Sequence, residues 1–294
     1  MPDMHMSADP RPVTDVARPR AAFQGELGAF SEEAVAQLWA NATPVPRRSF
    51  MDVARAVEQG AVEFGLLPIE NSLYGSVIGS YDALGASAEL HVVAETVVAI
   101  HHCLVAPHGA TVEALRTVAS HPVALGQCTR FLERHAWMEA RAAYDTAGAA
   151  RDVAARGDAT ASAIAGRRAA ERYGLAVLAA DIEDRPDNQT RFLAVAREPA
   201  VLPGGVPART ALLFQTANAP GALLRVLGPL AARGLNLSKL ESRPAPEPWS
   251  YHFFLEMEHE AGHAGASAAV EEIRGVTQSL RVLGTFAKWG GVAR

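Results

Sequence analysis

The sequence predicts an α/β fold followed by a smaller sandwich of helices on an antiparallel sheet. The chain has 294 residues, and at roughly 150 residues per domain this length indicates two domains. Over about the first 200 residues, short apolar strands alternate with amphipathic helical segments, which is the pattern of an α/β fold. Prolines and glycines then crowd into residues 198–207 before a second run of elements begins.

The elements of the first part are recognised by their caps and by the period of their apolar residues. Ser49 and Asp52 form a capping arrangement, and Gly60 stops the helix that they open. Alternating apolar residues predict one long extended stretch at 90–106, and Pro122 suits the first turn of a helix. In chain order we expect strand 20–24, helix 31–40, the helix between Ser49 and Gly60, strand 64–69, the extended stretch 90–106, helices 122–135, 146–157 and 160–173, and strands 175–180 and 191–197.

Residues 199–207 form the predicted linker, because their density of proline and glycine leaves no room for a helix or a strand. Beyond it we expect strand 209–215, helix 220–233, strands 235–243 and 251–258, helix 266–275 and strand 279–286. This βαββαβ order over about 80 residues is that of a ferredoxin-like sandwich. The predicted divisions are a disordered tail (1–19), a first domain (20–198), the linker (199–207) and a second domain (208–294).

Composition excludes several classes of partner. The net charge of −5 argues against a nucleic-acid-binding surface. No apolar run reaches the roughly 18 residues that span a bilayer. Residues 1–20 lack the apolar centre of a secretory signal. We therefore predict a cytoplasmic protein with neither a nucleic-acid nor a membrane partner.

The small numbers of lysine and cysteine residues argue against several classes of cofactor. Lys239 and Lys288 are the two lysines, so the first 238 residues offer neither a Schiff-base lysine nor a Gly-Lys-Ser/Thr phosphate loop. Residues 25–28 lack the spacing of a dinucleotide-binding loop. Cys103 and Cys128 cannot build a disulfide framework. The sequence predicts no cofactor.

Polar side chains gather at three junctions between a strand and its neighbouring element. These are Pro-Ile-Glu-Asn-Ser at 68–72, Ser-His-Pro at 120–122 with Gln127 downstream, and Asp-Asn-Gln-Thr-Arg-Phe at 187–192. Because ligands of open α/β sheets bind beyond the carboxyl ends of strands, such side chains can meet a ligand. Each junction could equally be a helix cap or a turn, and spacing alone leaves both interpretations open.

Metal and nucleophile sites are weaker candidates. His101, His102 and Cys103 follow one another, but successive side chains of a strand point to opposite faces and cannot converge on one ion. Cys128 shares an apolar helix face with Leu125, which favours a buried, inert thiol. We predict no metal site.

Six motifs in order resemble the prephenate dehydratase family. They are Gln-Gly-Glu-Leu-Gly-Ala-Phe-Ser at 24–31, the 68–72 motif, the 120–122 motif with Gln-Cys at 127–128, Asn-Gln-Thr-Arg-Phe at 188–192, Gly-Ala-Leu at 221–223, and Asn-Leu-Ser-Lys-Leu-Glu-Ser-Arg-Pro at 236–244. The last two resemble an ACT regulatory domain. The resemblance covers about residues 20–286 and is to the monofunctional form. Gly-Thr-Phe at 284–286 departs from the usual Gly-Ser-Tyr-like ending.

The resemblance implies a two-lobed catalytic domain, similar to periplasmic binding proteins, that converts prephenate to phenylpyruvate, water and carbon dioxide. Thr190 is then the proton donor or hydrogen-bond partner of the departing hydroxyl, with Glu70 or a water behind it as a relay. The other residues implied in catalysis are Asn71, Ser120 and Gln127, and those implied in substrate binding are Ser31, Ser72, His121 and Arg191. Strand alternation favours a structural or interface role for Arg191, and both roles stay open.

For the ACT part, the resemblance implies feedback inhibition by L-phenylalanine bound between subunits of a homodimer or homotetramer. The implied effector site consists of Gly221, Ala222, Leu223, Asn236, Glu241, Ser242, Arg243 and Pro244. Two alternatives stay open. The substrate could be arogenate, which carries an amino group where prephenate has a keto oxygen, or the protein could sense an amino acid without catalysis.

Overall fold

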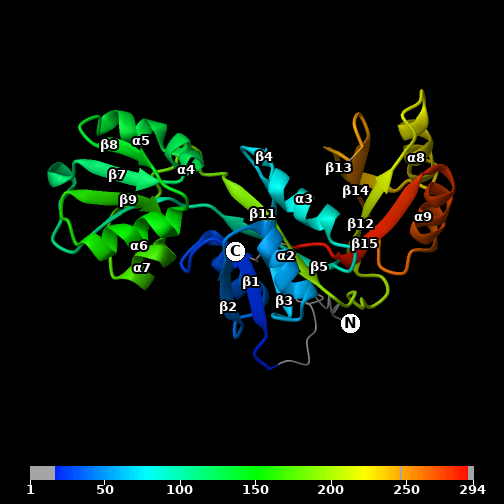
Figure 1. Ribbon diagram of the computed structural model, residues 1–294, viewed down its shortest axis with the longest axis horizontal. Helices are drawn as coiled ribbons and strands as arrows, with labels where there is room; N and C mark the ends of the chain where they lie inside the picture. Colours follow the sequence, from blue (N-terminus) through cyan, green and yellow to red (C-terminus); the bar gives the residue numbers. More distant parts are fainter. Residues whose placement is uncertain (1–16, 246, 291–294) are drawn as a thin grey trace, which may run out of the picture.

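The computed structural model describes residues 17–245 and 247–290. Three bodies lie in a row in Figure 1: lobe 1 (residues 20–100 and 188–196) in the middle, lobe 2 (residues 101–187) on one side and the C-terminal domain (residues 207–288) on the other. Of the predicted tail, residues 1–16 lie outside the described residues. No helix in the described part of the chain has the length and apolarity of a membrane-spanning helix.

Lobe 1 is built on a sheet of order β2-β1-β3-β11-β5. Strand β1 is parallel to its neighbours β2 and β3, whereas β11 returns from lobe 2 and runs antiparallel to both β3 and β5. The elements are β1 (Arg20–Gln24), α1 (Phe30–Leu38), β2 (Thr43–Arg47), α2 (Phe50–Glu58), β3 (Phe64–Asn71), β4 (Gly75–Ser76), α3 (Ile78–Ala86), β5 (His91–Ala99) and β11 (Gln189–Ala196).

Lobe 2 carries a five-stranded sheet of order β10-β6-β9-β7-β8. Its elements are β6 (Cys103–Ala106), the 3-10 helix η1 (Val112–Ala114), β7 (Thr117–Ser120), α4 (Pro122–Gln127), α5 (Thr129–Arg134), β8 (Glu139–Ala142), α6 (Thr146–Arg156), β9 (Ala161–Ala165), α7 (Arg167–Tyr173) and β10 (Ala176–Ala179). The chain enters lobe 2 after β5 and leaves it before β11, so two crossings join the lobes.

The structure corrects three predicted elements. The extended stretch 90–106 divides into β5 and β6, because residues 100–102 carry the chain from one sheet to the other. The predicted helix 160–173 is strand β9 followed by helix α7. Burial on both faces makes β9 a central strand despite its alanines, since tertiary packing outweighs weak local propensity. The predicted helix 122–135 is interrupted at Cys128.

The C-terminal domain has the predicted βαββαβ order, in an antiparallel sheet β13-β14-β12-β15 with both helices on one face. Its elements are β12 (Pro207–Gln215), α8 (Ala222–Ala231), β13 (Asn236–Pro244), β14 (Tyr251–Glu260), α9 (Ala264–Val276) and β15 (Ser279–Ala287). The predicted fold class, a two-lobed α/β domain followed by a ferredoxin-like domain, is confirmed.

The open face of the C-terminal sheet packs on lobe 1. Phe254, Leu283 and Phe286 share one buried core with Tyr81 and Leu84 of helix α3. At Gly284 the two backbones touch: a Cβ there would lie 2.1 Å from the carbonyl oxygen of Val92 in β5, and the φ of +157° also favours glycine. The C-terminal domain is therefore docked on lobe 1 as well as joined to it by the linker.

Candidate active site

Two residues predicted to be catalytic face each other across strands β3 and β11. Asn71 and Thr190 are register partners, and Asn71 Nδ2 lies 3.0 Å from Thr190 Oγ1. The same nitrogen lies 2.9 Å from Asn188 Oδ1. Asn71 Oδ1 accepts hydrogen bonds from the main-chain amides of Leu73 and Tyr74, which fixes the orientation of the side-chain amide. The sequence thus places a preorganised donor against the Thr190 hydroxyl.

The Thr190 hydroxyl has a proton that can serve a ligand. Its oxygen accepts a hydrogen bond from Asn71, and within the described residues no group accepts its proton. A hydroxyl whose oxygen accepts a hydrogen bond is a stronger donor, because hydrogen bonds in a chain polarise one another. The pair can therefore donate a hydrogen bond to an oxygen atom that gathers negative charge.

A cavity of about 370 Å³ lies where lobes 1 and 2 meet; Asn71 and Thr190 do not line it themselves, but Asn188, which contacts Asn71, does. Asn188 is only 1% exposed, and no described group accepts from its Nδ2. Because buried polar groups are rarely left unpaired, this amide is available to a ligand. The residues that line the cavity are Ser72, Leu73, Tyr74, Gly126, Gln127, Glu183, Asp184, Arg185 and Asn188.

Gln127, on the lobe 2 side of the cavity, is held by a histidine. Its Oε1 lies 2.8 Å from His102 Nε2. An amide oxygen can only accept a hydrogen bond, so Nε2 carries the hydrogen. Burial is the largest influence on the pKa of His102 and lowers it, although Gln127 and Glu183 act in the opposite direction. The imidazole is therefore neutral at neutral pH and orients Gln127.

The other predicted cleft residues are distributed unevenly. Ser72 lines the cavity, where its Oγ donates to the main-chain oxygen of Asp187 at 3.0 Å. Ser120 is fully buried and donates to the main-chain oxygen of Ile164 at 2.6 Å. His121 caps α4, because its Nδ1 accepts from the amide of Val123 at 3.2 Å. Neither Ser120 nor His121 lines the cavity, and the same holds for Ser31 in the first turn of α1.

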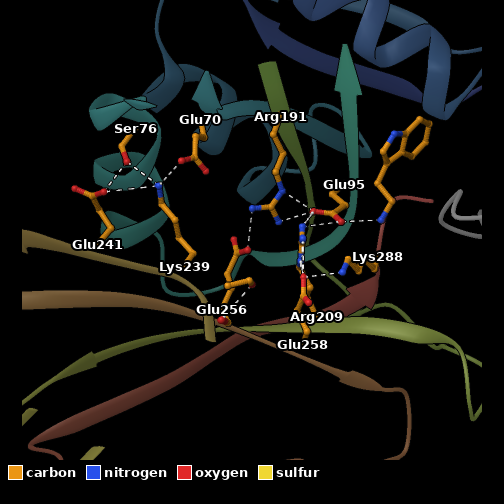
Figure 2. Close-up of polar contacts among 12 residues, drawn as sticks. Glu70, Ser76, Glu95, Arg191, Arg209, Lys239, Glu241, Glu256, Glu258 and Lys288 are labelled. Carbon is orange, nitrogen blue, oxygen red and sulfur yellow. Dashed lines mark hydrogen bonds and ion pairs between the residues drawn. The ribbon is translucent and has the colours of Figure 1, made fainter. Parts of the chain in front are cut away.

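Glu70 and Arg191 lie on the opposite face of the two strands. Figure 2 shows both side chains pointing toward the C-terminal domain, where Glu70 Oε1 lies 3.0 Å from Lys239 Nζ and Arg191 Nη1 lies 2.8 Å from Glu256 Oε2. Successive side chains of a strand alternate between faces, so Glu70 cannot stand behind Thr190 when Asn71 faces it. The structure does not bring Glu70 or Arg191 to the cavity.

One group of potential metal ligands lies at the hinge. His101, Asp181 and Glu183 place one ligand atom each within 4.8 Å of one another. Glu183 is already engaged, because it accepts from the amide of His102 at 2.8 Å and lies 2.9 Å from His101 Nδ1. His102 and Cys103 are not part of this group, and because His101 and His102 lie between strands β5 and β6, strand alternation does not determine where they point.

The residues of the implied effector site fall into two groups, one at the start of α8 and one on strand β13. Gly221 is the N-cap of α8 in a left-handed conformation, with a φ of +74°, and Ala222 and Leu223 follow in the first turn. Asn236 donates to Glu258 Oε2 at 3.1 Å. Glu241 accepts from Ser76 at 2.5 Å and Arg243 pairs with Asp82 at 3.1 Å, both in lobe 1. Ser242 and Pro244 lie on the same strand, β13, which is an edge of the sheet.

Sequence reasoning missed several residues around the cavity, among them Tyr74, Arg185 and Asn188. Asn188 belongs to the 188–192 motif, and its position two residues before Thr190 is the signal that could have identified it. Arg185 offers the cavity a cation that is paired with Asp187 at 2.9 Å. No sequence pattern distinguishes it from the other arginines of the chain.

Two family models match most of the described residues. Residues 21–200 match the family model "Prephenate dehydratase", and residues 210–276 match the model "ACT domain". The chain is 38% identical over 296 residues to arogenate dehydratase 2 of Petunia hybrida, a match that covers 96% of this chain and 75% of that protein.

Two solved structures resemble the fold over nearly its full length. A prephenate dehydratase from Arthrobacter aurescens in complex with L-Phe has a TM-score of 0.84 and 31% identity, covering 92% of this chain and 90% of the other. A protein described as GqqA, of a novel type of quorum quenching acylases, has a TM-score of 0.85 and 34% identity, covering 92% and 98%. Because each match covers 92% of the chain, the likeness includes both lobes and the C-terminal domain.

Proposed function

The chain belongs to the prephenate dehydratase family and carries a C-terminal ACT domain, and on that premise we propose that it converts prephenate to phenylpyruvate, carbon dioxide and water. The observation that supports this most is the hydrogen bond from Asn71 to Thr190 beside the cavity between the lobes. It leaves the proton of the Thr190 hydroxyl free for the oxygen that departs.

The proposed reaction depends more on holding the substrate in the right orientation than on a strong acid or base. The bond from the ring to its carboxylate breaks and releases carbon dioxide, its electron pair enters the ring, and the bond to the ring hydroxyl breaks. The ring becomes aromatic, which supplies the driving force. Thr190 hydrogen-bonds the leaving hydroxyl and passes it one proton, which Thr190 recovers from solvent, so that water departs instead of hydroxide. Holding the breaking bonds in the right orientation is the second contribution of the site.

The cavity offers mostly neutral hydrogen-bonding groups to the substrate. Asn188 has an unpaired buried amide, and Gln127 is fixed by His102. The carboxylates of Glu183 and Asp184 accept from main-chain amides, which offsets part of their charge. Arg185 is the cation at this cavity and would meet a substrate carboxylate. Such preorganised donors act on charge that develops in the transition state.

The relatives support two substrates, and prephenate is the one that we propose. The plant relative is named an arogenate dehydratase, whereas the Arthrobacter protein is named a prephenate dehydratase. An acylase activity, named for one structural relative, finds less support. Covalent acyl transfer needs an activated nucleophile, whereas Ser72 donates to a main-chain oxygen and burial raises the pKa of the Cys128 thiol.

We also propose feedback inhibition by L-phenylalanine through the ACT domain, in a homodimer or homotetramer. The solved complex of the Arthrobacter protein with L-Phe supports the effector. The exposed edge of strand β13 supports pairing with a second copy, because an open strand edge is a template for another strand. The first turn of α8, after Gly221, offers free main-chain amides to a carboxylate. The cytoplasmic location stays a prediction from the sequence.

The decisive assay incubates the protein with prephenate and, separately, with arogenate. Phenylpyruvate is measured by its absorbance in alkali, and L-phenylalanine by chromatography. The Thr190→Ala protein, purified in the same way, is the control for spontaneous aromatisation and for contaminating enzymes. Phenylpyruvate well above this control supports the proposal. Product from arogenate alone assigns the alternative substrate, and product from neither rejects catalysis in favour of a sensor.

A further inference from the structure

Two neighbouring residue pairs of strands β3 and β11 face opposite sides of the sheet. Asn71 pairs in register with Thr190, and Glu70 pairs with Arg191 one residue away. Because side chains alternate along a strand, the two pairs face opposite sides: Glu70 and Arg191 face the C-terminal domain, whereas Asn71 lies on the other side, where it contacts Asn188 of the cavity wall. Any displacement of Glu70 or Arg191 moves the backbone that carries Asn71 and Thr190, since each is covalently adjacent to one of them.

Glu70 is held by a lysine of the C-terminal domain. Lys239 Nζ, on strand β13, lies 3.0 Å from Glu70 Oε1 and donates to Ser76 Oγ at 2.9 Å. Ser76 in turn donates to Glu241 Oε2 at 2.5 Å. The side chain of Lys239 is only 14% exposed. Figure 2 shows this group as a compact bridge between lobe 1 and β13.

Arg191 is held more deeply, between two carboxylates. Its Nε lies 2.6 Å from Glu95 Oε2 of lobe 1 and its Nη1 lies 2.8 Å from Glu256 Oε2 of β14. The side chains of Glu95 and Glu256 are 1% and 6% exposed. Burial opposes the charge of Arg191, but the two carboxylates outweigh it and raise its pKa. A buried charge pair tolerates little change in geometry, because separating the partners leaves both unpaired.

The bridge extends to a second arginine. Arg209 of β12 lies 2.7 Å from Glu95 Oε2 and 2.9 Å from Glu258 Oε1, and Lys288 also contacts Glu258 at 2.9 Å. Three cations and three carboxylates therefore balance in this group, counting Arg191 and Glu256. Such a network fixes how the C-terminal sheet sits on the strands of lobe 1.

We propose that Glu70 and Arg191 are positioning residues through which the C-terminal domain holds the Asn71–Thr190 pair in its active geometry. The Glu70–Lys239 and Arg191–Glu256 bridges are the two links. An effector that shifts β13 and β14 would act on the cavity face by straining them. This inference rests on the proposed function, because it assigns the geometry of the same pair to the regulatory domain.

The test compares three variants in full-length protein. Lys239→Gln removes the cation, and Lys239→Arg keeps it as the conservative rescue. Asp82→Asn is the matched control, because it neutralises the Asp82–Arg243 ion pair, which also joins lobe 1 to β13 but starts from α3 rather than β3 or β11. Thermal unfolding confirms that each variant is folded. Turnover and hydrogen exchange of residues 64–71 and 189–196 are then measured without effector.

We expect kcat to fall about tenfold in Lys239→Gln with KM changed less than about twofold, because misplacement of a catalytic group affects the transition state more than ground-state binding. Hydrogen exchange in the two strands should accelerate. Lys239→Arg and Asp82→Asn should stay within about threefold of the wild-type kcat. Equal kcat in Lys239→Gln and Lys239→Arg, or an equal loss in Asp82→Asn, would overturn the proposal. Should the wild-type chain convert neither substrate, the proposed function fails, and the exchange rates alone decide whether the bridges hold the strands.

Discussion

Lobe 1 meets its two neighbours through chemically different junctions. Toward lobe 2 its polar groups are mostly neutral, and some of them, such as Asn188 Nδ2, have no partner among the described residues. Toward the C-terminal domain its polar groups are charged and paired with one another around Glu95 and Arg191, beside large apolar side chains. Unpaired neutral groups can receive a ligand, whereas paired charges fix a position. The same sheet therefore has one face suited to binding and one suited to docking.

The largest expected loss of activity at the binding face comes from Thr190→Ala. Removal of one hydrogen bond to developing charge costs about 3 kcal/mol, so kcat should fall roughly a hundredfold or more. Thr190→Ser keeps the hydroxyl and should recover much of the rate. Steady-state kinetics with prephenate measure both variants. Near-wild-type turnover in Thr190→Ala would remove Thr190 from the mechanism.

The docking face is tested by Gly284→Ala. A methyl group would meet the carbonyl oxygen of Val92 at 2.1 Å, so β15 must move away from β5. Overpacking of this kind costs about 1–3 kcal/mol, and we expect the free energy of unfolding to drop by that amount in denaturant titrations. Limited proteolysis within residues 198–206 should also accelerate. Gly275→Ala is the control, since no atom lies within 4 Å of its Cβ position, and equal stability of the two variants would contradict this contact.

Gly221→Val tests whether the effector acts from the docking side. The φ of +74° strains a β-branched residue, and the side chain would cover the amides at the start of α8. We expect the half-inhibiting concentration of L-phenylalanine to rise at least tenfold, about 1.4 kcal/mol, while turnover without effector stays unchanged. Gly228→Val in the same helix, where nothing lies within 4 Å, should behave as wild type. Undiminished inhibition in Gly221→Val would place the inhibitor elsewhere.

The smallest expected effect is on how the free energy of unfolding depends on pH, which differs between groups at the two junctions. His102 has a pKa below the ordinary 6.5, so as the pH falls below 6.5 the unfolded chain binds a proton that the folded chain excludes, and stability decreases. Hydrogen bonds from Lys288, Arg209 and Asn236 overcome burial and lower the pKa of Glu258 to about 2. The stability that this carboxylate contributes is complete above pH 4.5 and lost only toward pH 2.

Denaturant titrations between pH 7.5 and 5 should therefore show a decline in stability that a His102→Gln variant lacks. A Glu258→Gln variant should keep the slope of the wild-type protein over this range. A pH-independent wild-type stability would show that His102 does not carry the predicted shift.

The sequence predicted the C-terminal domain better than lobe 2, for a physical reason. Strand β13 alternates between exposed and half-buried residues along its whole length, so its pattern is visible locally. Strand β9 is buried on both faces and alanine-rich, which in isolation is indistinguishable from a helix. Strand β2 was not predicted because it contains two prolines, which argue against a strand in the interior of a sheet. It is an edge strand, where proline is tolerated.

At the candidate site, motif resemblance identified Asn71 and Thr190, which the structure brings into hydrogen-bond contact. It could not assign their neighbours to a face. Glu70 and Arg191 stand next to them in sequence, and a shift of one residue along a strand reverses the direction of a side chain. The predicted start of the last strand at residue 191 left Thr190 outside it, whereas β11 begins at Gln189.

The scarcity of lysine gives this molecule a built-in reporter. Lys239 and Lys288 are its two ε-amines, and both contact carboxylates at the docking face, with side chains 14% and 40% exposed. An amine-selective reagent read by mass spectrometry therefore footprints that face alone, apart from the terminal amine. Labelling of Lys239 with and without effector would follow the release of the C-terminal sheet directly, without any introduced probe.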